Sequence, residues 1–78
     1  MEPILLERVN IVRPYEVLCY RVCYYLLQDE QQAIKAAQEV MAKLIRDDRL
    51  FKEIGLDVER YIKKEAMKIS LQVIYSKE

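Results

Sequence analysis

The sequence predicts an all-α fold, and three observations carry that prediction. The 78 residues are 53% hydrophobic and 33% charged, a balance that is typical of a packed chain and unlike that of a disordered one. Only one glycine and two prolines interrupt the chain, whereas an all-β fold needs frequent turns. Apolar residues also recur with helical spacing. We therefore expect a three-helix bundle with a short N-terminal arm or extra helix, in which residues 1–78 form one domain.

The first half of the chain predicts one helix and leaves the path of its N-terminal segment open. Residues 1–12 alternate poorly and contain Pro3, so either a short helix or an extended arm is expected there. Pro14 suits the first turn of a helix, and residues 15–28 contain nothing that breaks one. This helix is apolar on nearly every side, which predicts a central position. It carries four tyrosines: Tyr15, Tyr20, Tyr24 and Tyr25.

A second helix is predicted over residues 30–46. Asp29 has the side chain of an N-cap, and Gln32 three positions later completes a capping box, so the helix should begin at Glu30. Its apolar positions follow the spacing i, i+3, i+4, i+7 as far as Arg46. They are Ala33, Ala36, Ala37, Val40, Met41, Leu44 and Ile45.

A third helix is predicted after a short connection. Gly55 is placed to end a turn, and Asp57 can cap the helix that follows. The residues expected to pin the connection to the core are Leu50, Phe51, Ile54 and Leu56. The apolar stripe of the helix is Val58, Tyr61, Ile62, Ala66, Ile69, Val73 and Ile74. Its outer side, expected to gather a local excess of positive charge on one face, is Arg60, Lys63, Lys64, Lys68 and Gln72.

Charge and hydropathy limit the classes of partner. Thirteen basic and thirteen acidic residues cancel, so the net charge gives no reason to expect a nucleic acid or a membrane surface as the main partner. The longest apolar run covers residues 22–27, far short of the roughly 20 residues that span a bilayer. Glu2 and Pro3 stand where a signal peptide carries basic residues. We expect a cytoplasmic protein.

The residue types that usually carry catalysis are missing. The chain has no histidine, no glycine-rich phosphate loop and no carboxylates clustered at metal-binding spacing, so neither an enzyme nor a cofactor is expected. Cys19 and Cys23 alone cannot provide the four ligands of a zinc site. In a reducing compartment two such thiols are expected to be small core residues. No metal site is predicted.

The order of the helices and of their motifs resembles region 2 of bacterial RNA polymerase sigma factors of the extracytoplasmic-function type. In that family a tyrosine-rich first helix ends near a short polar turn, and the second helix carries Gln-Glu followed by two hydrophobic residues. The corresponding segments here are Tyr24-Tyr25-Leu26-Leu27 and Gln38-Glu39-Val40-Met41, and Tyr61-Ile62 matches the aromatic-aliphatic opening of the third helix. The resemblance covers about residues 13–75.

The resemblance implies a non-enzymatic transcription protein that binds core RNA polymerase. The polar face of the second helix would contact the clamp helices of the polymerase β′ subunit. The implied partner-binding residues are Gln38 and Glu39 at the centre, with Lys35, Ala42 and Arg46 on the flanks. A buried rim would favour an arginine of the partner opposite Glu39. A companion sigma-like or anti-sigma protein is a further expected partner.

Two departures from the family pattern change what is expected. Lys35 stands where the family has an acidic residue, which reverses one charge at the expected interface. The end of the third helix lacks the family's Arg-Asn pair and basic run, so weak or no direct DNA binding is expected. The residues left for DNA are Lys63, Lys64, Lys68 and Tyr75.

Two other functions stay open on the sequence alone. The first is a small helical interaction module or homodimer, unrelated to transcription, in which the tyrosines of the first helix form an aromatic interface or only reach out to water. The second is a nucleic-acid binder that uses the third helix alone, for which affinity would fall steeply with added salt.

Overall fold

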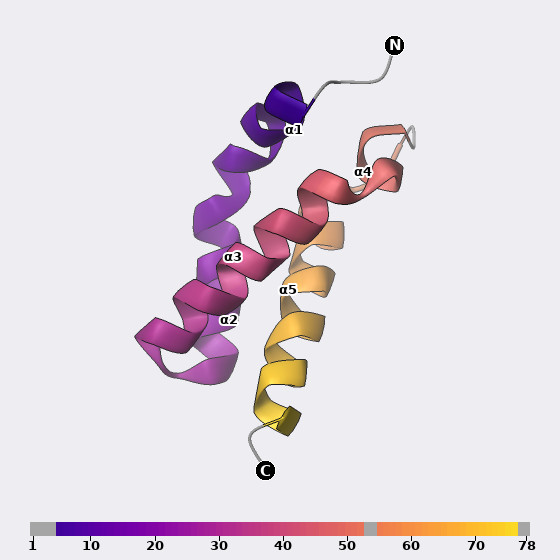
Figure 1. Ribbon diagram of the computed structural model, residues 1–78. Helices are drawn as coiled ribbons and strands as arrows, with labels where there is room; N and C mark the ends of the chain where they lie inside the picture. The colour runs from indigo at the N-terminus through magenta and orange to yellow at the C-terminus, as the bar shows by residue number, and fades with distance from the viewer. Residues whose placement is uncertain (1–4, 53–54, 77–78) are drawn as a thin grey trace.

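The computed structural model describes residues 5–52 and 55–76, and the predicted all-α fold is confirmed within these ranges. Figure 1 shows a long bent arm of α1 and α2, α3 running back beside it, and α5 returning along α3. The elements are α1 (Leu5–Val12), the 3-10 turn η1 (Arg13–Tyr15), α2 (Glu16–Leu27), α3 (Glu30–Arg46), the short α4 (Asp48–Lys52) and α5 (Val58–Ser76).

The core lies where α2, α3 and α5 pack against one another. α3 contributes the largest share of it, as its apolar spacing predicts, with small alanines near its start and larger residues toward its end. Small side chains allow the neighbouring helices to approach closely, and the larger ones fill the space beyond them. The buried apolar residues are Val12, Cys19, Cys23, Ala33, Ala36, Ala37, Val40, Leu44, Leu50, Ile62, Ala66 and Ile69.

The predicted central position of α2 is confirmed by its packing against both α3 and α5, but the outer side of the helix is exposed. Cys19 and Cys23 are fully buried, but Val17, Tyr24 and Tyr25 are 59%, 44% and 76% exposed. The physical reason is geometric: α2 packs mainly against α3 and α5, and each contact covers part of its circumference. An apolar composition on all sides therefore leaves an apolar surface on the side without a neighbour.

The start of α3 confirms the predicted N-cap. The Asp29 carboxylate accepts a hydrogen bond from the Gln32 backbone N–H at 3.0 Å, which satisfies one of the free donors in the first turn. The reciprocal half of the capping box is absent, because the Gln32 side-chain oxygen has no hydrogen-bond partner among the described residues. Before this cap, Gln28 takes a left-handed conformation with φ of 54° and reverses the chain between α2 and α3.

The described part of the N-terminal segment is helical and lies against the end of α3. Residues 1–4 of the expected arm lie outside the described residues, whereas α1 forms a helix that leads through η1 and Pro14 into α2. Arg8 holds it there: its guanidinium donates to the Ile45 carbonyl at 3.0 Å and lies over the Phe51 ring. Residues from α1, α3 and α4 thus meet at one side chain.

The connection between α3 and α5 follows the prediction in part. Leu50 is buried and Phe51 and Leu56 are half-buried, whereas Ile54 lies outside the described residues. Gly55 has a φ of +84°, a conformation that a side chain would strain. Asp57 caps α5 as predicted, since its carboxylate accepts from the Arg60 backbone N–H at 3.2 Å.

The sequence did not indicate the role of Asp47. Its carboxylate accepts hydrogen bonds from the Arg49 backbone N–H, at 3.0 Å, and from the Tyr61 hydroxyl. One side chain therefore caps α4 and joins the end of α3 to the first turns of α5. The hydrogen bond to Asp47, together with burial, raises the pKa of Tyr61 to about 12.

Candidate partner-binding site

The five predicted partner-binding residues of α3 are all exposed. They lie on the side of the helix away from the buried stripe, where the structure leaves them uncovered. We call this set, Lys35, Gln38, Glu39, Ala42 and Arg46, the α3 ridge. One turn of the helix separates Lys35 from Glu39 and Gln38 from Ala42, so the set follows the helix axis for about 16 Å.

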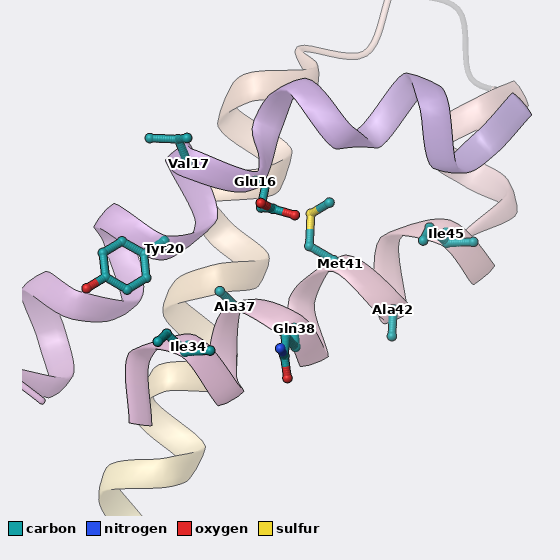
Figure 2. A pocket seen from close by; sticks show the side chains of 9 residues that line it. All are labelled: Glu16, Val17, Tyr20, Ile34, Ala37, Gln38, Met41, Ala42 and Ile45. Carbon is teal, nitrogen blue, oxygen red and sulfur yellow. The ribbon is translucent and has the colours of Figure 1, made fainter. Parts of the chain in front are cut away.

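A groove between α2 and α3 borders one side of the α3 ridge. Its volume is about 550 Å³, and its walls are mostly apolar. Figure 2 shows Met41 reaching from α3 toward Glu16 on α2, whereas Gln38 and Ala42 point away from α2 at the edge of the groove. The lining residues are Glu16, Val17, Tyr20, Ile34, Ala37, Gln38, Met41, Ala42 and Ile45.

A second groove, of about 350 Å³, lies between α3 and α5 on the other side of the α3 ridge. Ala42 lines both grooves, so this small residue stands on the crest between them. Lys35 lines neither of the two. The second groove is lined by Glu39, Ala42, Lys43, Arg46, Ile69 and Gln72. A partner that lies along α3 can therefore insert side chains on both sides of the crest.

The charges beside the second groove are arranged so that Glu39 stays available. Nζ of Lys43 on α3 lies 3.4 Å from Oε2 of Glu65 on α5, and Glu65 is only 8% exposed. This ion pair directs the Lys43 side chain toward α5. Within the described ranges, the Glu39 carboxylate has no ion pair in the chain. A carboxylate at such a position can accept a charge-assisted hydrogen bond from a partner's arginine.

The four residues expected to be left for DNA do not form one site. Lys63, Lys64, Lys68 and Tyr75 are all exposed, but Lys63 lines a groove of about 320 Å³ on the side of α5 that faces α2. Gln72 lines the groove on the opposite side of α5. The expectation that the basic residues share one face with Gln72 is therefore wrong, because their spacing distributes them around most of the exposed circumference.

Two of these lysines are also partly neutralised. Lys63 lies 3.4 Å from Glu59 one turn earlier, and Lys68 lies 3.9 Å from Glu65. The Lys63–Glu59 pair is exposed and adds little to stability. Both pairs reduce the positive potential that a phosphate backbone would meet.

Two stacked tyrosine rings lie at the surface of α2. The rings of Tyr20 and Tyr24 lie 5.8 Å apart, and Tyr20 also lines the α2–α3 groove. Val17 and Ile34 line the same groove and are 59% and 43% exposed. Apolar and aromatic side chains that remain exposed together in this way are typical of protein interfaces.

The two cysteines are free thiols in the core, as expected from their number and spacing. Burial raises the pKa of Cys19 to about 11 and also raises the pKa of Cys23, so both thiols are protonated at neutral pH. The Cys19 sulfur lies 4.0 Å from the Met41 sulfur. In the part of the chain that the structure describes, no three His, Cys, Asp or Glu residues are grouped to hold a metal ion.

Among the described helices, none combines the length and the apolarity that crossing a bilayer requires. No family model, curated protein or solved structure matches this chain.

The sequence indicated the α3 ridge but not the grooves beside it. Ile34 is an isoleucine outside the predicted stripe of α3, and Val17 stands on a helix that is apolar on nearly every side and was predicted to be central. An apolar residue that falls off the buried stripe is a sequence signal of an exposed contact surface, as is the group of tyrosines on α2. Which helices meet at each groove depends on tertiary packing, and a helical period does not specify it.

Proposed function

We propose that the chain is a non-enzymatic helical domain, similar to sigma region 2, that docks on core RNA polymerase through the α3 ridge. The observation that carries this proposal is Glu39: an exposed carboxylate without an ion pair among the described residues, at the centre of a ridge with an open groove on each side. Two helices of a partner, such as the clamp helices of the β′ subunit, can straddle such a ridge. The motif order Gln38-Glu39-Val40-Met41 supports the same partner by resemblance.

The chemistry of the ridge fits recognition rather than catalysis. Ala42 allows a close approach of a partner backbone, and Gln38 and Glu39 offer hydrogen-bonding groups beside it. Lys35 and Arg46 add positive charge at the two ends, which would select a partner with acidic residues at the corresponding positions. A separate polypeptide would supply DNA binding in this proposal, and the domain would work in the cytoplasm.

A pull-down of core RNA polymerase by the tagged protein tests the proposal, with Glu39→Arg as the test variant. A matched control is Glu7→Arg, which makes the same charge change at an exposed position of α1. Binding by the wild type and by Glu7→Arg, together with loss of binding by Glu39→Arg, supports the α3 ridge as the docking surface. Binding by all three proteins would contradict the assignment of the ridge, and binding by none would contradict the polymerase as the partner.

A second candidate function is favoured by the exposed surface of α2. In this alternative the chain is a helical interaction module or homodimer, in which Tyr20, Tyr24 and Val17 meet the same residues of a second copy. Size-exclusion chromatography with light scattering distinguishes the two proposals. A dimer that Tyr24→Lys dissociates favours self-association through α2, whereas a monomer at all concentrations excludes it.

A further inference from the structure

The C-terminal half of α5 exposes an apolar strip that the buried core does not use. Met67, Leu71 and Ile74 are 47%, 38% and 38% exposed, at spacings of four and three residues. These spacings bring the three side chains onto one side of the helix. Ile74 was predicted to be in the core stripe, and its exposure shows that this stripe ends before the end of α5. We call Met67, Leu71 and Ile74 the α5 strip.

A shallow groove extends the α5 strip toward α2. Met67 lines this groove, of about 320 Å³, together with Tyr25 and Leu26 of α2. Tyr25 is 76% exposed, so its ring adds to the apolar surface rather than closing it. The groove provides a place for one large apolar side chain of a partner, next to a strip that can hold the following turns of a helix.

Positive charges flank the apolar surface on both sides. Arg21 and Lys63 line the groove on the side of α2. Lys64 and Lys68 follow the other edge of the α5 strip, since each is three positions from a strip residue. All four are exposed. Lys63 pairs with the exposed Glu59 and Lys68 with the buried Glu65, whereas Arg21 and Lys64 have no ion pair within the described residues. A partner with acidic residues on both sides of an apolar face would complement this arrangement.

We propose that the α5 strip, with the groove at Met67, is a second docking surface that binds an amphipathic helix with an apolar face and acidic flanks. It lies on the side of the molecule formed by α2 and α5, away from the α3 ridge, so it does not depend on the proposed polymerase contact. The helical spacing of the strip matches the i, i+3, i+4, i+7 anchors of a helical partner. The apolar strip favours a protein over a nucleic acid.

Two designed peptides provide the probe. Each has about 21 residues, long enough for a helix of about 30 Å, with leucine at the a and d positions of its heptads. One peptide has glutamate at the e and g positions, where like charges discourage self-association, and the other has lysine there. Fluorescence anisotropy measures binding to the full chain at about 0.15 M salt.

The expected result is that the glutamate peptide binds about tenfold more tightly than the lysine peptide. Leu71→Glu should weaken the binding of the glutamate peptide about tenfold, and Lys64→Glu should weaken it while strengthening the lysine peptide. The matched control Leu6→Glu changes an equally apolar side chain, 66% exposed on α1, and should leave binding unchanged. Glu39→Arg should also leave it unchanged, which separates this surface from the α3 ridge.

Three results would overturn the proposal. They are equal binding of the two peptides, no binding of the glutamate peptide by the folded chain, and binding that Leu71→Glu does not weaken while circular dichroism shows the variant to be folded. A third probe, labelled oligothymidylate, is a single-stranded DNA and tests whether the surface binds nucleic acid. If it binds and is released by Lys64→Glu while the glutamate peptide does not bind, the surface recognises nucleic acid instead.

Discussion

Nη2 of Arg8 donates a hydrogen bond to Oδ1 of Asp48 at 2.8 Å and so joins α1 to α4. The Arg8 side chain is only 12% exposed, whereas that of Asp48 is 64% exposed. The same guanidinium reaches the Ile45 carbonyl at the end of α3 and lies 4.7 Å from the centre of the Phe51 ring. A single largely buried cation therefore holds the N-terminal helix on the body of the domain.

Replacing Arg8 should destabilise the fold and loosen α1. Arg8→Met keeps most of the apolar stem but removes the hydrogen bonds and the charge, and we expect a loss of about 1 to 2 kcal/mol in the free energy of unfolding. Urea denaturation measures the loss, and hydrogen exchange in α1 shows where it acts. Arg13→Met, an exposed arginine in η1, is the matched control. An Arg8→Met protein as stable as the control would show that α1 is held by other contacts.

The pairing with Arg8 predicts an acid dependence of stability. The hydrogen bond and charge of Arg8 lower the pKa of Asp48 below its usual 3.8. A lowered folded pKa stabilises the protein above the unfolded value, and this contribution is lost as the pH falls through the lower pKa of the folded state. The wild type should therefore have a higher free energy of unfolding than Asp48→Asn at neutral pH, and this difference should disappear below about pH 4. A stability difference that stays constant from pH 7 to pH 2 would contradict the pairing.

Tyr61 gives the corresponding prediction at alkaline pH. Its pKa rises from 10.0 to about 12 because the hydroxyl donates to Asp47, so the bond stabilises the fold fully below pH 10 and is lost as the pH passes 12. Tyr61→Phe should lower the free energy of unfolding by about 1 to 2 kcal/mol at pH 7. Above pH 10 the variant should lose less stability than the wild type does. Chemical denaturation at several pH values provides the test. Identical alkaline profiles for the two proteins would exclude the hydrogen bond.

Ser70 is predicted to reduce stability. Its hydroxyl is fully buried, and the thiol of Cys23 is the one side chain that interacts with it among the described residues. A thiol is a weak hydrogen-bonding group, so the hydroxyl loses water without a complete replacement. Ser70→Ala should raise the free energy of unfolding by up to about 1 kcal/mol. Ser76→Ala, which removes an exposed hydroxyl bonded to the Val73 carbonyl, should be neutral or slightly destabilising. Destabilisation by Ser70→Ala would indicate that the hydroxyl is satisfied.

Cys19 and Cys23 should react with thiol reagents only when the protein unfolds. Both side chains are fully buried, and burial raises the pKa of each thiol, so the reactive thiolate is scarce as well as inaccessible. Labelling by a chromogenic disulfide should be complete in denaturant and slow in buffer, at a rate that follows global unfolding. Rapid labelling of the native protein would contradict the burial of α2 against α3 and α5.

The sequence predicted what depends on local spacing and missed what depends on distant residues. The Asp29 cap and the alanine-rich stripe of α3 follow from residues within a few positions of one another, and both are confirmed. The hydrogen bonds of Arg8 to Asp48 and of Asp47 to Tyr61 join residues 40 and 14 positions apart, and no local period indicates them. The sequence left open how far the tyrosines of α2 reach the surface, since burial depends on how many neighbours a helix has.

The α3 ridge was predicted as a set, and the structure places all five of its residues at the surface. The grooves on either side of it and the apolar strip on α5 were not predicted. Both follow from the crossing of helices that are separate in the sequence, so they become visible only when the helices are assembled.

The measurement that tests the docking proposal most directly is site-specific cross-linking from the crest of the α3 ridge. A photoreactive amino acid at Ala42, which lines both grooves, would be irradiated in the presence of core RNA polymerase, with the same group at Glu7 as the control. The account predicts a cross-link from position 42 to the β′ subunit that is lost with Glu39→Arg, and none from position 7. Cross-linking from position 7 alone, or from neither position while the protein remains folded, would contradict docking through α3.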